Sequence, residues 1–325
     1  MYSNKYVILL LAAFSLSACS SANKFSGLPY LFNDKKAYAQ ARDLYSEGKY
    51  EQAIQELNAY IRKPYNVKRR EARAYRLLGQ SYEQTGQLSK ALETYLEALE
   101  FHSKNTPLLT AAAGLYQRTG LTDRSIELYE RALKQDPENL DALSGQAENY
   151  RAMGFYSRAR EFYDRFFALN PNAPAQYRAK YADTFLNQHN YEQAFINITM
   201  ALEQDNSSSD FWFISARALY GLQRSEEALK DLDLAIFLAP ERRDLLATKA
   251  LMLYHLKKYE QSQETNAKIL EKDPENQLGL FIKALNLRAQ GQVRDAQKIL
   301  TQITALDNAS FVGKTAGKWN ENLGL

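Results

Sequence analysis

The sequence predicts an all-α protein built from repeated pairs of helices, and three observations lead to this prediction. Glycines and prolines recur at an interval of 34 residues: Gly86, Gly120 and Gly154, then Pro137 and Pro171, and later Pro240 and Pro274. Small side chains return at two fixed positions of each period, and no segment shows the apolar–polar alternation of a β-strand. Self-similarity of this kind is typical of elongated repeat architectures, whose size is not limited by a single core.

Residues 1–18 have the layout of a secretory signal peptide. Lys5 supplies a positive charge, residues 6–16 form a mostly apolar run, and small residues then lead to Cys19. The run is too short to cross a bilayer. We therefore expect residues 1–18 to be removed from an exported protein.

The tetrapeptide Leu16-Ser17-Ala18-Cys19 resembles the lipobox of bacterial lipoproteins. This resemblance implies that Cys19 carries diacylglycerol, that the signal is cut before it, and that the new amine is acylated, with palmitate as a typical fatty acid. Three acyl chains, at about 0.8 kcal/mol for each buried methylene, approach irreversible anchoring. An uncleaved signal anchor and an ordinary signal with an incidental cysteine are the alternatives. Ser20, not Asp, follows the cysteine, and resemblance to the lipoproteins of enteric bacteria then implies export to the outer membrane, on its periplasmic face.

A tether is expected at residues 19–33, and eight repeats at residues 34–310. The predicted repeats span 34–71, 72–105, 106–139, 140–174, 175–208, 209–242, 243–276 and 277–310. They start at Asp34, Ala72, Thr106, Leu140, Ala175, Ser209, Arg243 and Gln277. We expect each repeat to hold two helices joined by a tight turn.

Small residues occupy the eighth and twentieth positions of every repeat. The eighth position holds Ala41, Gly79, Ala113, Ala147, Ala182, Ala216, Ala250 and Ala284. The twentieth holds Ala53, Ala91, Ser125, Ala159, Ala194, Ala228, Ser262 and Ala296. Small side chains let two helix backbones approach closely, and a bulky replacement would overpack such a site by about 1 to 3 kcal/mol. We expect the two helices of each repeat to cross at these positions.

Large residues and turn residues complete the pattern. Leu or an aromatic residue recurs at the eleventh position, and Tyr95, Tyr129, Tyr163 and Leu232 lie in the second helices, so we interpret most tyrosines as core residues. Glycine marks the turn in most repeats, at Gly48, Gly86, Gly120, Gly154 and Gly291. Repeats five to seven have His189, Gln223 and Lys257 instead, so we expect those turns to adopt a non-glycine conformation.

These repeats resemble the tetratricopeptide repeat (TPR) family, whose motif is a helix, a tight turn and a second helix in 34 residues. The resemblance covers residues 34–310 and implies a right-handed superhelical solenoid of about eight helix-turn-helix repeats. A stacked solenoid exposes its last apolar face unless it is covered. We therefore expect residues 311–325, with Phe311, Val312, Trp319 and Leu323, to form a C-terminal capping helix.

The resemblance also implies that first helices line a concave groove through positions two, five, nine and twelve. At the N-terminal end these positions give a basic and aromatic group: Tyr38, Arg42, Tyr45, Arg73 and Arg76. At the C-terminal end they give Phe213, Arg217, Tyr220, Leu251, Tyr254, Phe281 and Arg288. Aromatic residues and arginine dominate binding hot spots, so the C-terminal group is the preferred partner site. The alternative is that Leu251 and Phe281 only fill gaps between repeats.

Composition argues against several other functions. The net charge is +3, with 41 Lys plus Arg against 38 Asp plus Glu, and lacks the field that nucleic-acid binders use. The three histidines are not at metal-ligand spacing, and no phosphate loop, nucleophile elbow or dinucleotide fingerprint is present. We expect no catalysis, no metal and no cofactor. Cys19 is the single cysteine, so a disulfide within the chain is excluded.

The sequence thus predicts a lipid-anchored scaffold of the bacterial envelope. Its partners would be membrane lipid, through acylated Cys19, and another envelope protein or peptide segment held in the concave groove. Resemblance to TPR lipoproteins suggests work in pilus, outer-membrane or cell-wall assembly. The alternatives are a glycan or small-ligand binder, whose aromatic residues would stack on sugar rings, and an enzyme on a repeat scaffold. A basic run at 68–70 would contact anionic headgroups or form a solvated loop.

Overall fold

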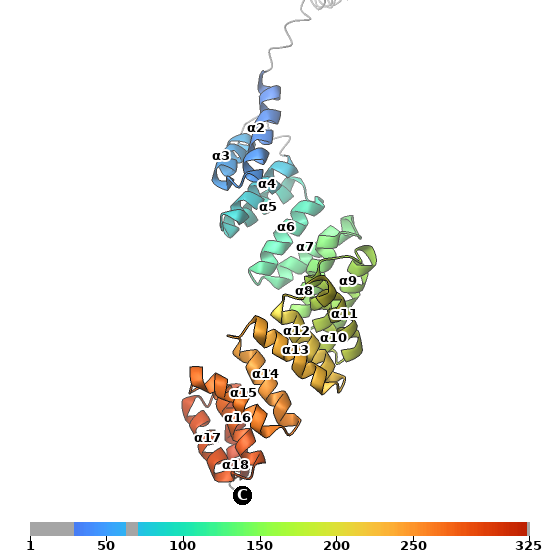
Figure 1. Ribbon diagram of the computed structural model, residues 1–325. Helices are drawn as coiled ribbons and strands as arrows, with labels where there is room; N and C mark the ends of the chain where they lie inside the picture. Colours follow the sequence, from blue (N-terminus) through green and yellow to red (C-terminus); the bar gives the residue numbers. More distant parts are fainter. Residues whose placement is uncertain (1–28, 63–70, 324–325) are drawn as a thin grey trace, which may run out of the picture. The chain divides into compact units, whose positions relative to one another are not determined.

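The computed structural model describes residues 29–62 and 71–323, and every regular element in these stretches is an α-helix (Figure 1). The predicted all-α class of paired repeat helices is confirmed. The signal peptide, Cys19 and the basic run at 68–70 lie outside the described residues.

Helices alternate as first and second members of pairs. The first helices are α2 (Pro29–Ser46), α4 (Ala72–Gln84), α6 (Thr106–Arg118), α8 (Leu140–Ala152), α10 (Ala175–Asn187), α12 (Ser209–Gly221), α14 (Arg243–His255) and α16 (Gln277–Ala289). From the second repeat onward, each begins at the residue predicted to start a repeat. The first helix, α2, begins at Pro29, earlier than the predicted start at Asp34.

The second helices follow after short turns. They are α3 (Tyr50–Ile61), α5 (Leu88–Phe101), α7 (Thr122–Gln135), α9 (Tyr156–Leu169), α11 (Tyr191–Gln204), α13 (Ser225–Leu238), α15 (Tyr259–Lys272) and α17 (Val293–Leu306). A further helix, α18 (Phe311–Leu323), occupies the region predicted to cap the stack. Prolines 137, 171, 240 and 274 fall between helices, where their missing N–H and fixed φ are tolerated.

The chain divides into two units, with the boundary between Asn149 and Tyr150 inside α8. Within the first unit, α2 packs on α3, α4 on α5 and α6 on α7, and the second helices α3 and α5 also contact the next first helices, α4 and α6. The second unit repeats this scheme from α9 to α17. There α18 packs on both α17 and α16, so it takes the place that the first helix of another repeat would have.

The small-residue positions lie where the helices of a pair cross. All the residues at the eighth and twentieth positions are buried. A Cβ added to Gly79 would lie 2.1 Å from Cε1 of Tyr95, whose ring is fully buried in the second helix of the same pair. In repeat seven the hydroxyl of Ser262 donates to the carbonyl of Ala250 at 2.8 Å. Close backbone approach therefore requires small side chains on both helices.

The expectation of a different turn in repeats five to seven is wrong. His189, Gln223 and Lys257 adopt φ of 57°, 65° and 61°, the same left-handed region as the turn glycines of the other repeats. The hydrogen bonds are also the same: Lys257 N donates to Tyr254 O at 2.9 Å, and Lys258 N to Leu253 O at 2.9 Å. This pair of bonds is the Schellman motif, which closes a helix only when one residue is left-handed. The hydrogen bonds at the end of the first helix, and not the residue type, therefore determine the left-handed conformation of the turn residue.

The tyrosines of the second helices belong to the core, as the sequence interpretation held. Tyr95 and Tyr163 are fully buried and Tyr129 nearly so. The Tyr95 hydroxyl donates to Glu83 Oε1 at 2.6 Å, and burial together with this carboxylate raises the pKa of Tyr95. These rings therefore stabilise the pairs and are not available to a partner.

Candidate functional site

First helices present their positions two, five, nine and twelve on a common face, because these positions are spaced by three or four residues. Within each unit the side chains of such positions contact one another between neighbouring first helices. In the first unit the Arg73 guanidinium lies over the Tyr38 ring, 4.7 Å from its centroid, and so links α4 to α2. Both residues belong to the predicted N-terminal group.

The remaining members of the N-terminal group are not drawn into this contact. Arg42 is exposed and pairs with Asp43 at 2.9 Å. The Tyr45 ring packs edge-on against Tyr50, with centroids 5.3 Å apart, and burial raises the pKa of Tyr45. Arg76 is exposed on α4. The N-terminal group is therefore one stacked pair, Tyr38 with Arg73, flanked by separate side chains.

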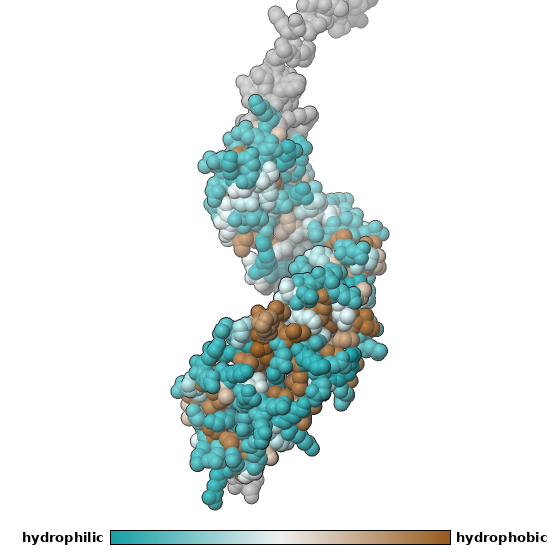
Figure 2. Space-filling view, in the orientation of Figure 1, coloured by the Kyte–Doolittle hydropathy of each residue, from teal (hydrophilic) through white to brown (hydrophobic). Residues whose placement is uncertain are grey.

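The C-terminal group begins on α12 with Phe213, Arg217 and Tyr220. Phe213 and Tyr220 are half-buried against the core of repeat six. Two guanidinium groups lie near the Phe213 ring, Arg217 at 5.7 Å and Arg242 at 5.8 Å from its centroid. Such contacts are favourable cation–π interactions. Figure 2 shows apolar residues gathered on the visible surface over α12 to α14.

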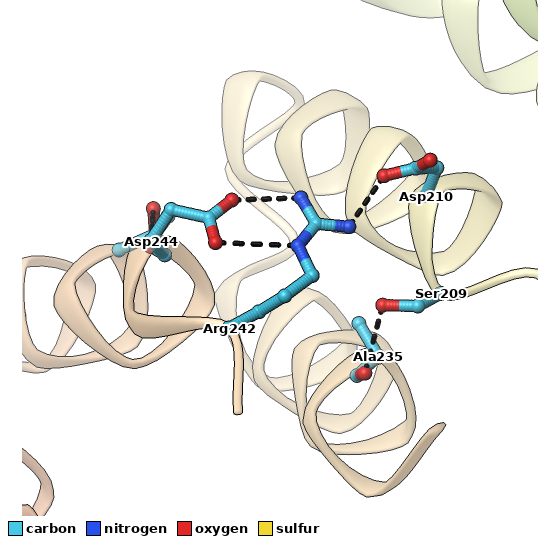
Figure 3. A network of polar contacts seen from close by, with 6 residues as sticks. Ser209, Asp210, Ala235, Arg242 and Asp244 are labelled. Carbon is cyan, nitrogen blue, oxygen red and sulfur yellow. Dashed lines mark hydrogen bonds and ion pairs between the residues drawn. The ribbon is translucent and has the colours of Figure 1, made fainter. Parts of the chain in front are cut away.

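Arg242 ties the first helices α12 and α14 together, as Figure 3 shows. Its Nη2 lies 2.7 Å from Asp244 at the start of α14, and its Nη1 pairs with Asp210 at the start of α12. The hydrogen bonds to Asp244 and Asp210 raise the pKa of Arg242. The neighbouring Ser209 donates to the Ala235 carbonyl of α13 at 2.9 Å. This network holds the α12 and α14 surfaces in one arrangement.

Arg217 is bound within a ladder of ion pairs. Its Nη1 lies 3.2 Å from Asp183 on α10, and the other oxygen of Asp183 lies 3.2 Å from Arg151 at the end of α8. All three side chains are partly buried. Asp183 is therefore already neutralised by two arginines. Arg217 acts first as a link between repeats.

The α14 members, Leu251 and Tyr254, remain partly exposed. Leu251 packs against a small core cluster that includes Ala250 and Ile269. The Tyr254 ring contacts Tyr259 of α15, with centroids 5.7 Å apart. Leu251 thus fills a gap between helices, as the alternative interpretation allowed, and still presents surface.

The capping helix covers the α16 members, Phe281 and Arg288. The Trp319 ring of α18 packs edge-on against Phe281, with centroids 5.7 Å apart, and the Arg288 guanidinium lies 4.6 Å above the Trp319 ring. Phe281, Val312 and Trp319 pack against one cluster. The chain itself therefore occupies part of the surface that the sequence assigned to a partner, and the open part is on α12 and α14.

A second feature, missed by the sequence interpretation, is a cleft of about 460 Å³ between α11, α12 and α13. Trp212 and Asp231 line it. Asp231 is the twenty-third residue of its repeat, a position that holds the buried, non-ionisable residues Thr94, Leu128, Asn197 and Thr265 in repeats two, three, five and seven. Repeat one also has a carboxylate there, Glu56, so this position alone does not single out the cleft.

Residues 29–62 and 71–323 hold no group of three or more His, Cys, Asp or Glu placed to bind a metal ion. None of the helices in those stretches has both the length and the apolar character that crossing a bilayer demands.

Comparison with known families agrees with this architecture. Two family models, both described as tetratricopeptide repeat, match residues 38–106 and 116–184. No curated protein matches the chain. The helix pairs, the crossings and these matches together define the class: this chain is a tetratricopeptide repeat protein.

Solved structures of the same class show the fold over most of the chain. A tetratricopeptide repeat protein from Parabacteroides merdae has a TM-score of 0.56 and 18% identity, covering 78% of this chain and 98% of its own. Pseudomonas aeruginosa pilF has a TM-score of 0.56 and 18% identity, covering 66% of this chain and 96% of its own. The APC/C hetero-tetramer Cut9–Hcn1 has a TM-score of 0.56 and 13% identity, covering 87% of this chain and 55% of its own. At these identities the likeness shows the fold alone.

Proposed function

We propose that this tetratricopeptide repeat protein is a lipid-anchored scaffold of the bacterial envelope, which captures a segment of another envelope protein on the first helices of repeats six and seven. The observation that supports this most is the open aromatic and apolar surface formed by Phe213, Tyr220, Leu251 and Tyr254. These side chains are partly exposed, while the Arg242 network fixes the helices that carry them. Rigid, partly buried aromatic residues are typical binding anchors.

The membrane half of the proposal rests on the sequence Leu16-Ser17-Ala18-Cys19. Only residues 20–28 separate this cysteine from the start of α2 at Pro29. An acylated Cys19 would therefore hold the repeats close to the lipid surface, on the periplasmic face of the outer membrane. The scaffold would act by positioning its partner there, without catalysis.

Replacing the cysteine tests the anchor. Cys19→Ala removes the sulfur that would carry diacylglycerol, so the protein should leave the membrane fraction and should no longer incorporate radiolabelled palmitate. The measurement is fractionation of native-host cells, with Ser20→Ala as the matched control that keeps the thiol. Retention of the Cys19→Ala protein in the membrane would contradict lipid anchoring.

A paired substitution tests the partner surface. Phe213→Ala with Tyr254→Ala removes two exposed rings, and recovery of partners after chemical crosslinking in cells should fall at least ten-fold. The control is Arg76→Ala with Thr110→Ala, which changes first-helix surface in the first unit. Both proteins should keep their helical circular dichroism. Equal recovery from the two variants would overturn this surface as the site.

A further inference from the structure

The cleft between α11, α12 and α13 lies on a different face of α12 from the proposed partner surface. Trp212, Ser215 and Leu219 line the cleft and follow one another three and four residues apart. Phe213, Arg217 and Tyr220 are each displaced from them by one or two residues, which is about one quarter to one half of a helical turn. A ligand in the cleft would therefore leave the first-helix surface free.

Apolar and aromatic side chains form much of the cleft wall. They are Phe195 and Leu202 from α11 and Trp212 and Leu219 from α12. The Trp212 indole N–H donates to the Asn206 carbonyl at 2.8 Å, which fixes the orientation of the ring. Trp212 is partly exposed. The cleft thus offers a rigid aromatic face next to a space of about 460 Å³.

Two carboxylates in this cleft form no ion pair among the described residues. Glu203 is exposed on α11, and no ion pair involves it in that part of the chain. Asp231 of α13 accepts a hydrogen bond from the buried Ser215 hydroxyl at 2.6 Å and forms no ion pair there either. A third carboxylate, Glu227, is bound by Arg224 at 2.7 Å, and Lys230 is exposed at the rim.

The environment of Asp231 disfavours its charge. Burial, with a smaller contribution from Glu227, raises the pKa of Asp231, while the Ser215 hydrogen bond and the nearby Arg224 act in the opposite direction. A carboxylate kept in a partly desolvated cleft without an ion pair costs stability, and such groups are concentrated at binding sites. A positively charged ligand would remove this cost.

One end of the cleft already shows how a cation is held. The Arg224 guanidinium lies 4.7 Å from the centroid of the Phe195 ring and forms two hydrogen bonds to Glu227, at 2.8 and 2.7 Å. An aromatic face and a carboxylate together make a favourable site for guanidinium. Trp212 and Asp231 offer the same two kinds of group elsewhere in the cleft, and among the described residues neither has an ion pair or a cation–π contact.

We propose that the α11–α13 cleft binds the side chain of an arginine or lysine on a partner protein, between the Trp212 ring and the carboxylates of Asp231 and Glu203. Charge complementarity favours this occupant, since the two carboxylates without an ion pair, Asp231 and Glu203, outnumber the one lysine that lines the cleft, Lys230. The same helices expose Ile196 and Met200 on α11 and Leu234 and Phe237 on α13, with Phe237 81% exposed. The partner segment would therefore carry apolar residues beside its basic one.

The test uses Trp212 as the reporter. The chain has two tryptophans, so Trp319→Phe leaves Trp212 as the single emitter. The full-length protein is titrated with the blocked peptide acetyl-Leu-Arg-Leu-amide, and with the same peptide carrying citrulline, which has nearly the shape of arginine without its charge. The arginine peptide should shift Trp212 emission saturably and bind at least ten-fold tighter than the citrulline peptide. Calorimetry on the protein with both tryptophans checks the same ratio.

Asp231→Asn with Glu203→Gln should abolish the preference for arginine. The matched control is Asp233→Asn with Glu192→Gln, the same change of charge on the same two helices outside the cleft, and it should keep the preference. The proposal is overturned if no saturable binding is seen, if citrulline binds as well as arginine, or if the cleft and control variants behave alike. Failure here leaves capture by Phe213 and Tyr254 intact, because that surface is assayed separately.

Discussion

Repeats two to four and repeats five to seven reach the same backbone by different chemistry. In the first group the left-handed turn residue is glycine, at Gly86, Gly120 and Gly154 with φ of 73° to 79°. In the second group it is His189, Gln223 and Lys257, at φ of 57° to 65°. A left-handed L-residue costs about 1 to 2 kcal/mol, so the second group accepts local strain that the first avoids. The crossing of the two helices and the Schellman hydrogen bonds determine the conformation of the turn in both groups.

The strained repeats are also those with the candidate binding features. The open aromatic surface lies on α12 and α14, and the cleft with Asp231 lies between α11 and α13. Local departures from structural rules are tolerated where the surroundings over-determine the conformation, and they gather at functional sites. The comparison therefore separates repeats that mainly build the stack from repeats that we propose also bind a partner.

The largest expected effect concerns the crossings, which both groups share. Gly79→Val would place a branched side chain against the Tyr95 ring, where even a Cβ lies 2.1 Å from the nearest ring carbon. We expect the free energy of unfolding to fall by about 3 kcal/mol. Gly114→Ala is the control, because its added Cβ meets only the Tyr129 oxygen at 3.5 Å. If urea denaturation finds the two variants alike, the crossings do not control the packing.

A smaller loss of stability is expected when a turn glycine of the first group is replaced by a residue with a side chain, as in the second group. Gly120→Ala adds a Cβ that finds nothing within 4 Å, so the whole effect is conformational. The free energy of unfolding should fall by about 1 to 2 kcal/mol. Thermal and urea denaturation measure the change, and an unchanged midpoint would mean that the left-handed turn carries no strain.

The reverse change in the second group should stabilise the protein. Lys257→Gly relieves the left-handed strain but adds freedom to the unfolded chain, so the net gain in the free energy of unfolding should be about 0.5 to 1 kcal/mol. Lys257→Asn should lie between lysine and glycine, because asparagine tolerates this region. A loss of stability with glycine would show that the lysine side chain itself holds the turn.

The smallest effect is a pH dependence at Asp231. Burial raises its pKa in the folded state, so the group favours folding while it is protonated in both states and loses that contribution as pH rises through the folded pKa. Asp231→Asn should therefore stabilise the protein at neutral pH by less than about 1 kcal/mol, because solvent screens this partly exposed charge. The gain should vanish in acid. A loss at neutral pH would mean that ionised Asp231 supports the fold.

Sequence alone predicted the parts of the fold that repeat. The interval of 34 residues, the small side chains such as Gly79 and Ala250, and the start of each first helix from Ala72 onward all follow from periodic packing. The turns of repeats five to seven were mispredicted because residue preference was weighed without the helix ends that constrain Gln223 and Lys257. In these turns the hydrogen bonds that close the helix terminus override the preference of non-glycine residues for negative φ.

The sequence predicted which residues belong to the candidate site, but it did not predict what those residues contact. Repeat numbering identified Phe213, Arg217 and Tyr254, yet it could not show that Asp183 neutralises Arg217 or that Trp319 covers Phe281. Such contacts join different repeats and depend on the registry of neighbouring helices, which no periodic column records. The α11–α13 cleft was missed for the same reason.

Site-specific photo-crosslinking in cells tests most directly whether recognition belongs to repeats six and seven. A benzophenone side chain replaces Phe213 in one protein and Thr110 in another; both residues are partly exposed and hold the fifth position of a first helix. The account predicts a discrete crosslinked partner from position 213 and none from position 110. Crosslinking from position 110 with none from position 213 would contradict it.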